Sequence, residues 1–288
     1  MASAQLPSRA SATGAVRPSI RAISHLTTPQ TAVVAALSTT PVKGLRIQRR
    51  EAIELDAGGV RENRRFYLVD DRARMVNGKQ LGILSAVVAS FDSKRRELAL
   101  SFPDGETVVA PVALSDWLDT RFFSREYRAQ LVDGPFSEAL SQYAGRSLRL
   151  VHADPATGRG IDRGIKGAVS LVGSASVAQL AQVAGRDVDS RRFRMLVEVD
   201  GLAAHAEDAW VGRDVRIGSA LVRMNGHVGR CLVTGQDPER GVADLPTLDL
   251  LRSYRAGIPT TEPLACGIYG EVLEPGEVRL GDAVLLVG

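Results

Sequence analysis

The stretch from Gly229 to Gly241 holds the residues whose types and spacing best suit chemistry. Cys231 follows Arg230 directly, and Asn225-Gly226 a few residues earlier is expected to break the strand Leu221–Met224. An adjacent cation favours the thiolate, the form of cysteine that acts as a nucleophile or metal ligand. Soft sulfur donors suit molybdenum, by extension of the general ligand-softness rule. The alternative is a buried cysteine that behaves as a small apolar side chain, the commoner role of a lone cysteine.

The spacing of cysteines and histidines argues against other common metal sites. Cys231 and Cys266 form no CxxC pair, and no histidine lies at ligand spacing from either. The four histidines make no HxH or HExxH pattern. A zinc or iron site built from protein ligands alone, or an iron–sulfur cluster, is therefore poorly supported. Two free thiols are the simpler interpretation, with a disulfide between them as the alternative.

The net charge of +3 comes from residues 1–30. This tail holds Arg9, Arg17 and Arg21 and no acidic residue, and the rest of the chain has 33 basic and 33 acidic residues. Nucleic-acid binding needs a basic face on the folded domain, so we expect no nucleic-acid partner. The tail lacks the apolar core of a secretory signal, and we expect a disordered segment or a mis-assigned start rather than a transit peptide. No apolar run is long enough to span a membrane, so we expect no membrane span and a cytoplasmic location.

Short apolar segments separated by turn signals position these residues and predict a mainly β fold with some α-helix. The strands expected in the first half are Thr31–Leu37, Arg65–Val69, Leu84–Phe91, Glu97–Phe102 and Thr107–Ala110. Pro103-Asp104-Gly105 predicts a hairpin turn, because proline presets φ and glycine accepts positive φ. Leu114–Phe123 and Pro135–Tyr143 are predicted helices, with Ser115 and Pro135 as start signals. This spacing favours a small barrel or sandwich.

The second half also predicts short strands. Those expected are Ala168–Val172, which runs through Gly173-Ser174-Ala175-Ser176 into a helix ending near Val183, and Phe193–Val199. Leu248–Tyr254 is a predicted helix with Thr247 as its cap. Val215–Val222 and Val278–Leu285 each suggest a strand, a glycine turn and a returning strand. These two similar segments favour a β-barrel-like body over a doubly wound sheet for the C-terminal half. No strand leads into a nucleotide-binding glycine motif, so a nucleotide-binding enzyme is a weak fit.

Several short motifs follow one another in order between Val33 and Gly288. They are Pro41-Val42-Lys43-Gly44, Arg64-Arg65-Phe66-Tyr67-Leu68-Val69, Phe193-Arg194, Ala206-Glu207-Asp208-Ala209-Trp210, Arg230-Cys231, Asp237-Pro238 with Gly241, Ser253-Tyr254-Arg255 and Gly276-Glu277-Val278-Arg279-Leu280-Gly281-Asp282. In this order they resemble the MOSC family, named for the C-terminal domain of molybdenum cofactor sulfurases. Within it they are most similar to the two-domain amidoxime-reducing components and their bacterial relatives. The resemblance implies a small N-terminal MOSC β-barrel-like domain at residues 31–130 and a C-terminal MOSC β-barrel domain at residues 131–288.

The resemblance also implies a molybdenum–molybdopterin cofactor. Cys231 would ligate the metal and serve as the catalytic residue, and the pterin dithiolene would supply the other two sulfurs. Such a cofactor is anionic at its phosphate and its metal head, so it needs cations and N–H donors around it. The residues expected to contact it are Lys43, Arg65, Ser174, Ser176, Arg194, Arg230 and Thr234. The two serines would act at a helix N-terminus, with simple helix capping as the alternative, and each arginine has the alternative of a solvated surface charge. Pyridoxal phosphate binding is a further possibility.

The sequence departs from the family pattern at several positions. Amidoxime reducers usually have a serine where Gly229 stands, and Pro-Asn where Met195 and Leu196 follow Phe193-Arg194. Asn77-Gly78-Lys79-Gln80 replaces a Thr-Ala-Arg-Gln-like stretch, and Gly235 replaces the second of two threonines. These changes leave the metal ligand in place and put substrate and pterin contacts in doubt.

The function that the resemblance implies is that of a molybdenum-dependent oxidoreductase. It would reduce N-hydroxylated or N-oxygenated small molecules. Since the chain has no flavin or iron–sulfur motif, electrons would come from a separate ferredoxin, flavin or cytochrome-type protein. The alternative is a non-catalytic carrier of molybdenum cofactor, or of sulfur, that uses Cys231. A structural β-domain with an inert cysteine ranks third.

Overall fold

The computed structural model describes residues 1–2, 32–122, 124–154 and 163–287. The predicted disordered tail lies outside the described residues, apart from 1–2. Residues Thr31–Gly288 make up one compact unit. Its strands form four sheets, which confirms the mainly β prediction. The sheets have open edges in the described residues and do not close into complete barrels.

The largest sheet has eight strands in the order β18-β14-β15-β16-β12-β13-β1-β2. Their bounds are β1 (Val33–Thr39), β2 (Gln48–Arg50), β12 (Val169–Gly173), β13 (Val197–Asp200), β14 (Asp214–Ile217), β15 (Ala220–Gly229), β16 (Ala265–Glu274) and β18 (Val284–Val287). Strands β12 and β13 are parallel, and the other neighbouring pairs of this sheet are antiparallel. This pattern agrees with the prediction that the C-terminal half is not a doubly wound sheet.

Strands from the start of the chain pair with strands from its end. β1 pairs with β13, and β3 (Ala52–Asp56) lies between β17 (Gly276–Arg279) and β4 (Gly59–Val60) in a three-stranded sheet. The buried side chains of Leu37, Ile53 and Val278 join one apolar core on these sheets. Burial of this shared apolar face, which no short segment could cover by itself, brings the distant segments together.

The two C-terminal segments of similar sequence, Val215–Val222 and Val278–Leu285, adopt different arrangements. The first forms the hairpin of β14 and β15, which turns at Gly218 with a φ of +55°. In the second, Gly281 has a φ of +82° between β17 and β18, but these two strands belong to different sheets. The predicted glycine turns are therefore present, and only the first segment returns as a hairpin. The predicted strand break at Asn225-Gly226 is wrong, because β15 continues to Gly229 and absorbs the irregularity as a shift in its register with β16.

The middle of the N-terminal half builds a separate lobe from two sheets. One has the order β5-β11-β10-β9 and the other β6-β7-β8. The bounds are β5 (Phe66–Val69), β6 (Val88–Asp92), β7 (Glu97–Ser101), β8 (Thr107–Pro111), β9 (Ala113–Phe122), β10 (Arg125–Asp133) and β11 (Arg149–Ala153). Helix α1 (Phe136–Ala144) buries Phe136 and Leu140 in the same core as Leu98 and Leu100. The predicted domain boundary at residues 130 and 131 falls within β10.

The predicted turn of this lobe is confirmed. Between β7 and β8, the Phe102 N–H donates to the carbonyl of Glu106 at 2.8 Å, and Gly105 has a φ of +93°. Proline at the first turn position and glycine at positive φ close the hairpin as expected.

The predicted helix at Leu114–Phe123 is wrong, because this segment is strand β9. It pairs antiparallel with β10, and the side chains of Thr120 and Phe122 alternate into the core. The hydroxyl of Ser115, expected to start a helix, donates instead to Asp133 on β10 at 2.6 Å. Cross-strand pairing with a segment ten residues later overrides the local start signal.

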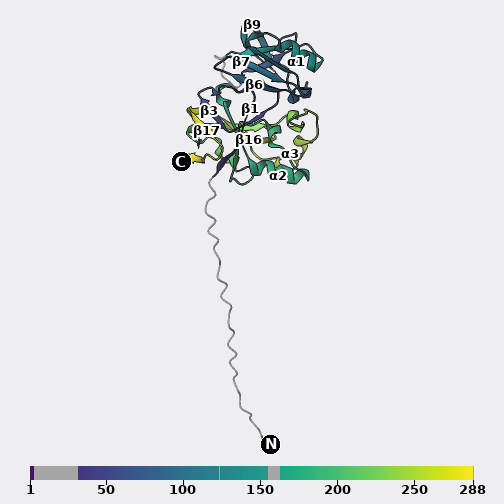
Figure 1. The fold of residues 1–288 in the computed structure, drawn as a ribbon. Helices are drawn as coiled ribbons and strands as arrows, with labels where there is room; N and C mark the ends of the chain where they lie inside the picture. The colour runs from purple at the N-terminus through teal and green to yellow at the C-terminus, as the bar shows by residue number, and fades with distance from the viewer. Residues whose placement is uncertain (3–31, 123, 155–162, 288) are drawn as a thin grey trace. The chain divides into compact units, whose positions relative to one another are not determined.

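Two helices cover the C-terminal lobe near the end of β15. Helix α2 (Ser174–Ala184) and helix α3 (Thr247–Arg255) bury Leu180 and Leu251 in one small core. The short 3-10 helices are η1 (Gly82–Ala86), η3 (Gly164–Gly167), η4 (Ser190–Phe193), η5 (Ala206–Trp210) and η6 (Leu232–Gly235). In Figure 1, α2 and α3 lie beside each other at the end of this unit opposite β9 and α1.

Two predicted strands are only partly strands. Phe193–Val199 begins in η4, passes through Arg194 at a φ of +54°, and becomes strand β13 only at Val197. Leu84–Phe91 begins in η1 and becomes β6 at Val88. In both segments, a 3-10 turn occupies the residues before the strand begins.

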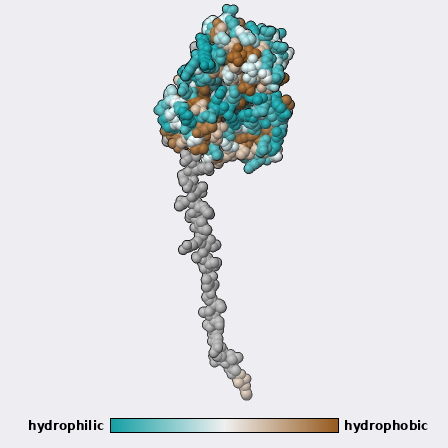
Figure 2. All heavy atoms as spheres, in the orientation of Figure 1, coloured by the Kyte–Doolittle hydropathy of each residue, from teal (hydrophilic) through white to brown (hydrophobic). Residues whose placement is uncertain are grey.

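The visible surface is mixed. Figure 2 shows hydrophobic residues in several separate groups among hydrophilic ones. No helix in the described part of the chain is long and apolar enough to cross a membrane.

A buried histidine makes the stability of the N-terminal lobe depend on pH. His152 lies on β11 against Phe66, and burial, followed by the charges of Arg65 and Arg96, lowers its pKa to about 4. The lowered pKa favours the neutral folded form, so its stabilising contribution is present above about pH 6.5 and is lost as the pH falls towards 4. Between pH 6.5 and 4, the free energy of unfolding of His152→Leu should fall by about 1–2 kcal/mol less than that of the wild type, allowing for solvent screening. Urea unfolding at several pH values measures this difference, and equal losses would contradict it.

Candidate functional site

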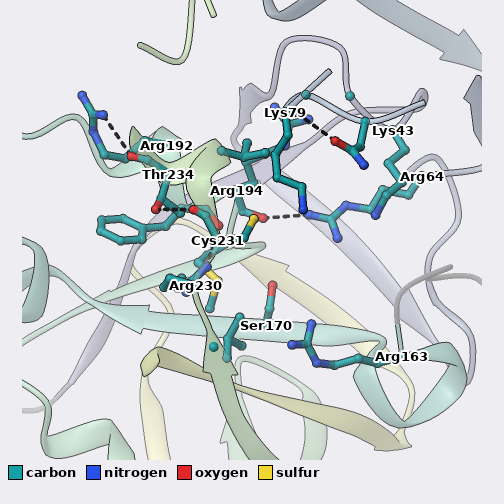
Figure 3. Close-up of a pocket in the computed structure, with 18 of the residues that line it drawn as sticks. Lys43, Arg64, Lys79, Arg163, Ser170, Arg192, Arg194, Arg230, Cys231 and Thr234 are labelled. Atoms are coloured by element: carbon teal, nitrogen blue, oxygen red, sulfur yellow. Dashed lines mark hydrogen bonds between the residues drawn. The ribbon is translucent and has the colours of Figure 1, made fainter. Parts of the chain in front are cut away.

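Cys231 stands at the end of β15, where the strand gives way to the turn of η6. Its thiol is free and exposed, whereas the thiol of Cys266 is free and buried on β16. Cys231 lines a cavity of about 240 Å³ that also contacts residues of the N-terminal lobe. Figure 3 shows the side chain of Cys231 among labelled lysine and arginine side chains from several segments. The structure therefore supports an accessible cysteine and not the disulfide alternative.

The cavity is lined by basic side chains and by no carboxylate among the described residues. Seven lysines and arginines line it, namely Lys43, Arg64, Lys79, Arg163, Arg192, Arg194 and Arg230. Two of them form ion pairs behind the wall, Arg192 with Asp244 at 3.2 Å and Arg163 with Glu262 at 2.6 Å. Cations that converge on one concave surface produce a positive potential that favours anionic ligands.

Lys43, Arg64 and Arg194 form the part of the wall built by the N-terminal lobe and η4. The Lys43 ammonium lies 5.0 Å from the ring centre of Phe122. Arg194 donates to the carbonyl of Leu45 at 2.6 Å, and the carbonyl of Arg194 accepts from Arg64 at 2.9 Å. The left-handed backbone of Arg194 at the end of η4 turns its side chain towards the N-terminal lobe. The predicted residues Lys43 and Arg194 are thus brought to the same cavity as Cys231.

Arg192 fixes the turn that follows Cys231. Its side chain is 2% exposed and donates to the carbonyls of Thr234 and Gln236 at 3.1 and 3.2 Å, besides its pair with Asp244. Thr234 in turn donates from its N–H and its hydroxyl to the carbonyl of Cys231, at 3.0 and 2.9 Å. The predicted residue Thr234 therefore lines the cavity and also shapes the backbone of Cys231.

Thr247, predicted to cap α3, has a different role. Its hydroxyl donates to the carbonyl of Thr234 at 2.8 Å, and Pro246 occupies the cap position. The Thr247 hydroxyl donates to this carbonyl, and not to the helix, because the buried carbonyl of Thr234 needs a donor.

Arg230 forms the floor of the cavity beneath Cys231. Its guanidinium donates to the carbonyls of Cys266 and Phe193 and contacts the sulfur of Met195 at 3.0 Å. It also lies 5.0 Å from the ring centre of Phe193. Desolvation by burial lowers the pKa of Arg230 to about 10, so it remains charged at neutral pH. The predicted residue is at the site, and its N–H groups already bind protein acceptors.

The structure does not bring Arg65, Ser174 and Ser176 to the cavity. Arg65 lies beside Arg64, and its Nε donates to the carbonyl of Arg61. The hydroxyl of Ser174 donates to Glu198 at 3.0 Å, and neither predicted serine caps α2, which Gly173 precedes.

Ser176 is fully buried, and its hydroxyl donates to the carboxylate of Glu207 at 2.7 Å. The same carboxylate accepts from the N–H of Gly173 at 3.1 Å, and burial raises the pKa of Glu207. The N-terminus of α2 thus binds a carboxylate of the protein, so the expected phosphate contact there lacks support.

Four basic residues of the cavity were missed in the sequence, although three of them lie within or beside noted motifs. Arg64 precedes Arg65, Lys79 lies within Asn77–Gln80, and Arg192 precedes Phe193. Arg163 follows a segment without a recognisable pattern, and only the tertiary structure places it at the cavity. The departures Met195, Gly229 and Asn77 line the cavity as well, whereas Leu196 lies outside its lining.

The two cysteines should differ in reactivity. Burial raises the pKa of Cys266 to about 11, with Arg230 acting in the opposite direction, whereas Cys231 is exposed. We expect one thiol per chain to react with iodoacetamide in the native protein and two after unfolding, because only a thiolate reacts and a buried thiol is inert. Intact-mass measurement counts the labelled thiols, and Cys231→Ser should abolish native labelling. Native labelling of Cys266 would contradict this expectation.

Two family models match the chain over most of its length. The MOSC N-terminal beta barrel domain matches residues 31–143, and the MOSC domain matches residues 158–285. The lysine and arginine residues of the cavity come from both matched regions.

Among known proteins, the chain is similar to proteins called mitochondrial amidoxime-reducing component 1. The Mus musculus protein is 27% identical over 287 residues, covering 90% of this chain and 83% of that protein. The Xenopus laevis protein is 27% identical over 289 residues with the same coverage. The Homo sapiens protein is 32% identical over 124 residues, which cover 41% of this chain and 36% of that protein.

Solved structures give a more distant likeness. The crystal structure of the YUAD protein from Bacillus subtilis has a TM-score of 0.41 and 12% sequence identity. The match covers 88% of this chain and 94% of that one.

Proposed function

We propose that this chain, which belongs to the MOSC-domain family and joins a MOSC N-terminal β-barrel domain to a MOSC domain, binds a molybdenum–molybdopterin cofactor through Cys231. In our proposal it uses this cofactor to reduce N-hydroxylated or N-oxygenated small molecules. The observation that carries the proposal is the exposed thiol of Cys231 in a cavity lined by seven basic residues and, among the described residues, by no carboxylate.

The donor set of the cavity fits such a cofactor. A thiolate is a soft ligand suited to the metal. The phosphate and the metal head are anionic, and arginine and lysine are the side chains that bind such groups. Lys43, Arg64, Lys79 and Arg194 would neutralise them from the cavity wall. Arg192 and Thr234 would hold the Cys231 backbone from behind, because their hydrogen bonds fix the turn of η6.

The expected reaction follows from the names of the similar proteins. When bound, the cofactor supplies the redox chemistry, and the protein supplies ligation, orientation and electrostatics. Reduction of an N–OH group to N–H consumes two electrons and two protons and releases water. Because this chain carries no flavin or iron–sulfur motif, we propose that the electrons come from a separate ferredoxin, flavin or cytochrome-type protein.

Other expectations about this protein stay predictions. The domain boundaries and the cytoplasmic location are among them, and the similar vertebrate proteins are called mitochondrial. Neither the family models nor the names of the similar proteins mention pyridoxal phosphate, and we do not propose it.

The test combines metal content with turnover. Protein from a cofactor-competent host should contain molybdenum near one atom per chain. With a reduced viologen as electron donor, it should convert an aromatic amidoxime to the amidine. Molybdenum without turnover of any N-hydroxylated compound would favour a cofactor carrier instead. Protein without molybdenum from a host that loads another molybdenum enzyme would overturn the proposal.

A further inference from the structure

The loop after α3 places Glu262 at the end of β15, next to the Cys231 segment. The Glu262 carboxylate accepts from the N–H of Gly229 at 2.8 Å. Gly229 is the last residue of β15 and stands two residues before Cys231. A side chain 33 residues later in the chain therefore holds the strand end from which Cys231 projects.

The carboxylate is itself held from the cavity side. Arg163 donates from its terminal nitrogen to Oε2 of Glu262 at 2.6 Å, and from its Nε to Oε1 at 3.3 Å. The guanidinium of Arg163 also lies 4.7 Å from the ring centre of Tyr269. Both Arg163 and Tyr269 line the cavity. A bidentate pair of this kind fixes direction as well as charge.

The loop that carries Glu262 is anchored to β15 at a second point. The N–H of Thr261 donates to Nδ1 of His227 at 3.1 Å, and the N–H of His227 donates to the hydroxyl of Thr261 at 2.7 Å. The hydroxyl of Thr260 donates to the carbonyl of Glu262 at 2.8 Å. The backbone of Glu262 is thus fixed independently of its own carboxylate.

Gly229 provides the space that Glu262 occupies. A Cβ atom at position 229 would come within 2.9 Å of the Cβ and of Oε2 of Glu262, and within 3.0 Å of the carbonyl oxygen of Pro263. Neighbours at these distances must shift. A side chain larger than glycine at position 229 would therefore displace the Glu262 carboxylate.

We propose that Glu262 is a positioning residue for Cys231, acting through the Gly229 amide. The cysteine backbone is then held on both sides, by Glu262 through Gly229 before it and by Thr234 after it. Between these two restraints its side chain is directed into the basic cavity. The inference rests on the proposed function only for what the sulfur binds, since the positioning itself is a property of the protein.

The test compares three substitutions at position 262 in the full-length protein. Glu262→Gln keeps an acceptor oxygen at the same reach, and Glu262→Ala removes it. Both remove the same charge, so a difference between them does not come from the charge. Glu262→Asp keeps the charge and shortens the side chain. The readouts are hydrogen exchange of the Gly229 amide by NMR and the alkylation rate of Cys231 by neutral iodoacetamide.

We expect the Gly229 amide to exchange at least about tenfold faster in Glu262→Ala and Glu262→Asp than in wild type, because a part-buried hydrogen bond to a carboxylate contributes on the order of 1.4 kcal/mol, a factor of ten. Glu262→Gln should stay within about threefold of wild type. The alkylation rate should differ at least about threefold between Glu262→Ala and Glu262→Gln, because a displaced sulfur presents a different access to the reagent.

Equal exchange and equal alkylation in the alanine and glutamine variants would overturn the inference. Should Glu262→Ala fail to fold, Gly229→Ala serves the same purpose, since its methyl group displaces the carboxylate, and wild-type alkylation in that variant would also overturn it. Molybdenum analysis of the wild type separates the two proposals. The expected exchange pattern in protein without molybdenum would contradict the proposed function and leave the role of Glu262 standing. Molybdenum without that pattern would contradict only the role of Glu262.

Discussion

Replacement of Cys231 by alanine is expected to leave the purified protein with less than about a tenth of the wild-type molybdenum and to lower amidoxime reduction more than about 100-fold. The physical reason is that Cys231 is the exposed thiol of the cavity, and loss of even an outer-shell partner of a metal ligand costs roughly 10–100-fold in affinity or activity. Elemental analysis and turnover with reduced viologen measure the two effects in the same preparation.

The matched control is Cys266→Ala, which removes the other cysteine. Cys266 is fully buried in the small core near α2 and α3, so its loss costs packing and leaves the cavity thiol in place. This variant should keep the molybdenum and turnover of the wild type and lose about 1–2 kcal/mol of stability, as small core truncations do. Turnover that survives in Cys231→Ala would exclude the cysteine as an essential ligand.

The second large effect is expected from Arg192→Leu, which should lower the free energy of unfolding by about 3 kcal/mol and strongly reduce molybdenum content. Removal of one partner of a buried ion pair typically costs about 3–5 kcal/mol, and here Asp244 keeps some solvent contact and a second arginine, Arg186. We expect the proposed cofactor to be lost, because the carbonyls of Thr234 and Gln236 lose their donor and the turn after Cys231 loosens.

Arg186→Leu is the control, because Arg186 pairs with the same carboxylate from a side chain that is 52% exposed. Exposed pairs contribute about 1 kcal/mol or less, so this variant should stay within 1 kcal/mol of wild type and keep its molybdenum. Urea unfolding and metal analysis of both variants provide the comparison. Equal losses of unfolding free energy in the two variants would mean that the burial of Arg192 does not determine its contribution to stability.

Local sequence signals predicted those elements whose formation depends on nearby residues. Thr107–Ala110 and the Pro103-Asp104-Gly105 turn appear as expected, since the turn residues fix the hairpin. The helix at Pro135–Tyr143 also appears, as α1. The segment Leu114–Phe123 was misjudged as a helix, because its strand conformation comes from pairing with β10.

For the site, the sequence by itself determined the metal-ligand candidate, the family and part of the cationic set. Cys231 beside Arg230, together with Lys43 and Arg194, could be named because each lies in a short motif. The resemblance could not separate Arg64 from Arg65, which are neighbours in one motif. Only the tertiary structure, in which Arg64 has a left-handed backbone with a φ of +50°, decides that Arg64 lines the cavity.

The tertiary structure alone decided which distant residues meet around the sulfur. Arg192 and Glu262 bind the backbone on either side of Cys231, and Arg163 holds Glu262, from three separate segments of the chain. Their positions depend on how the sheets pack and on where buried carbonyls and amides need partners. No local pattern encodes these demands, because each is met by a residue 33 or more positions away.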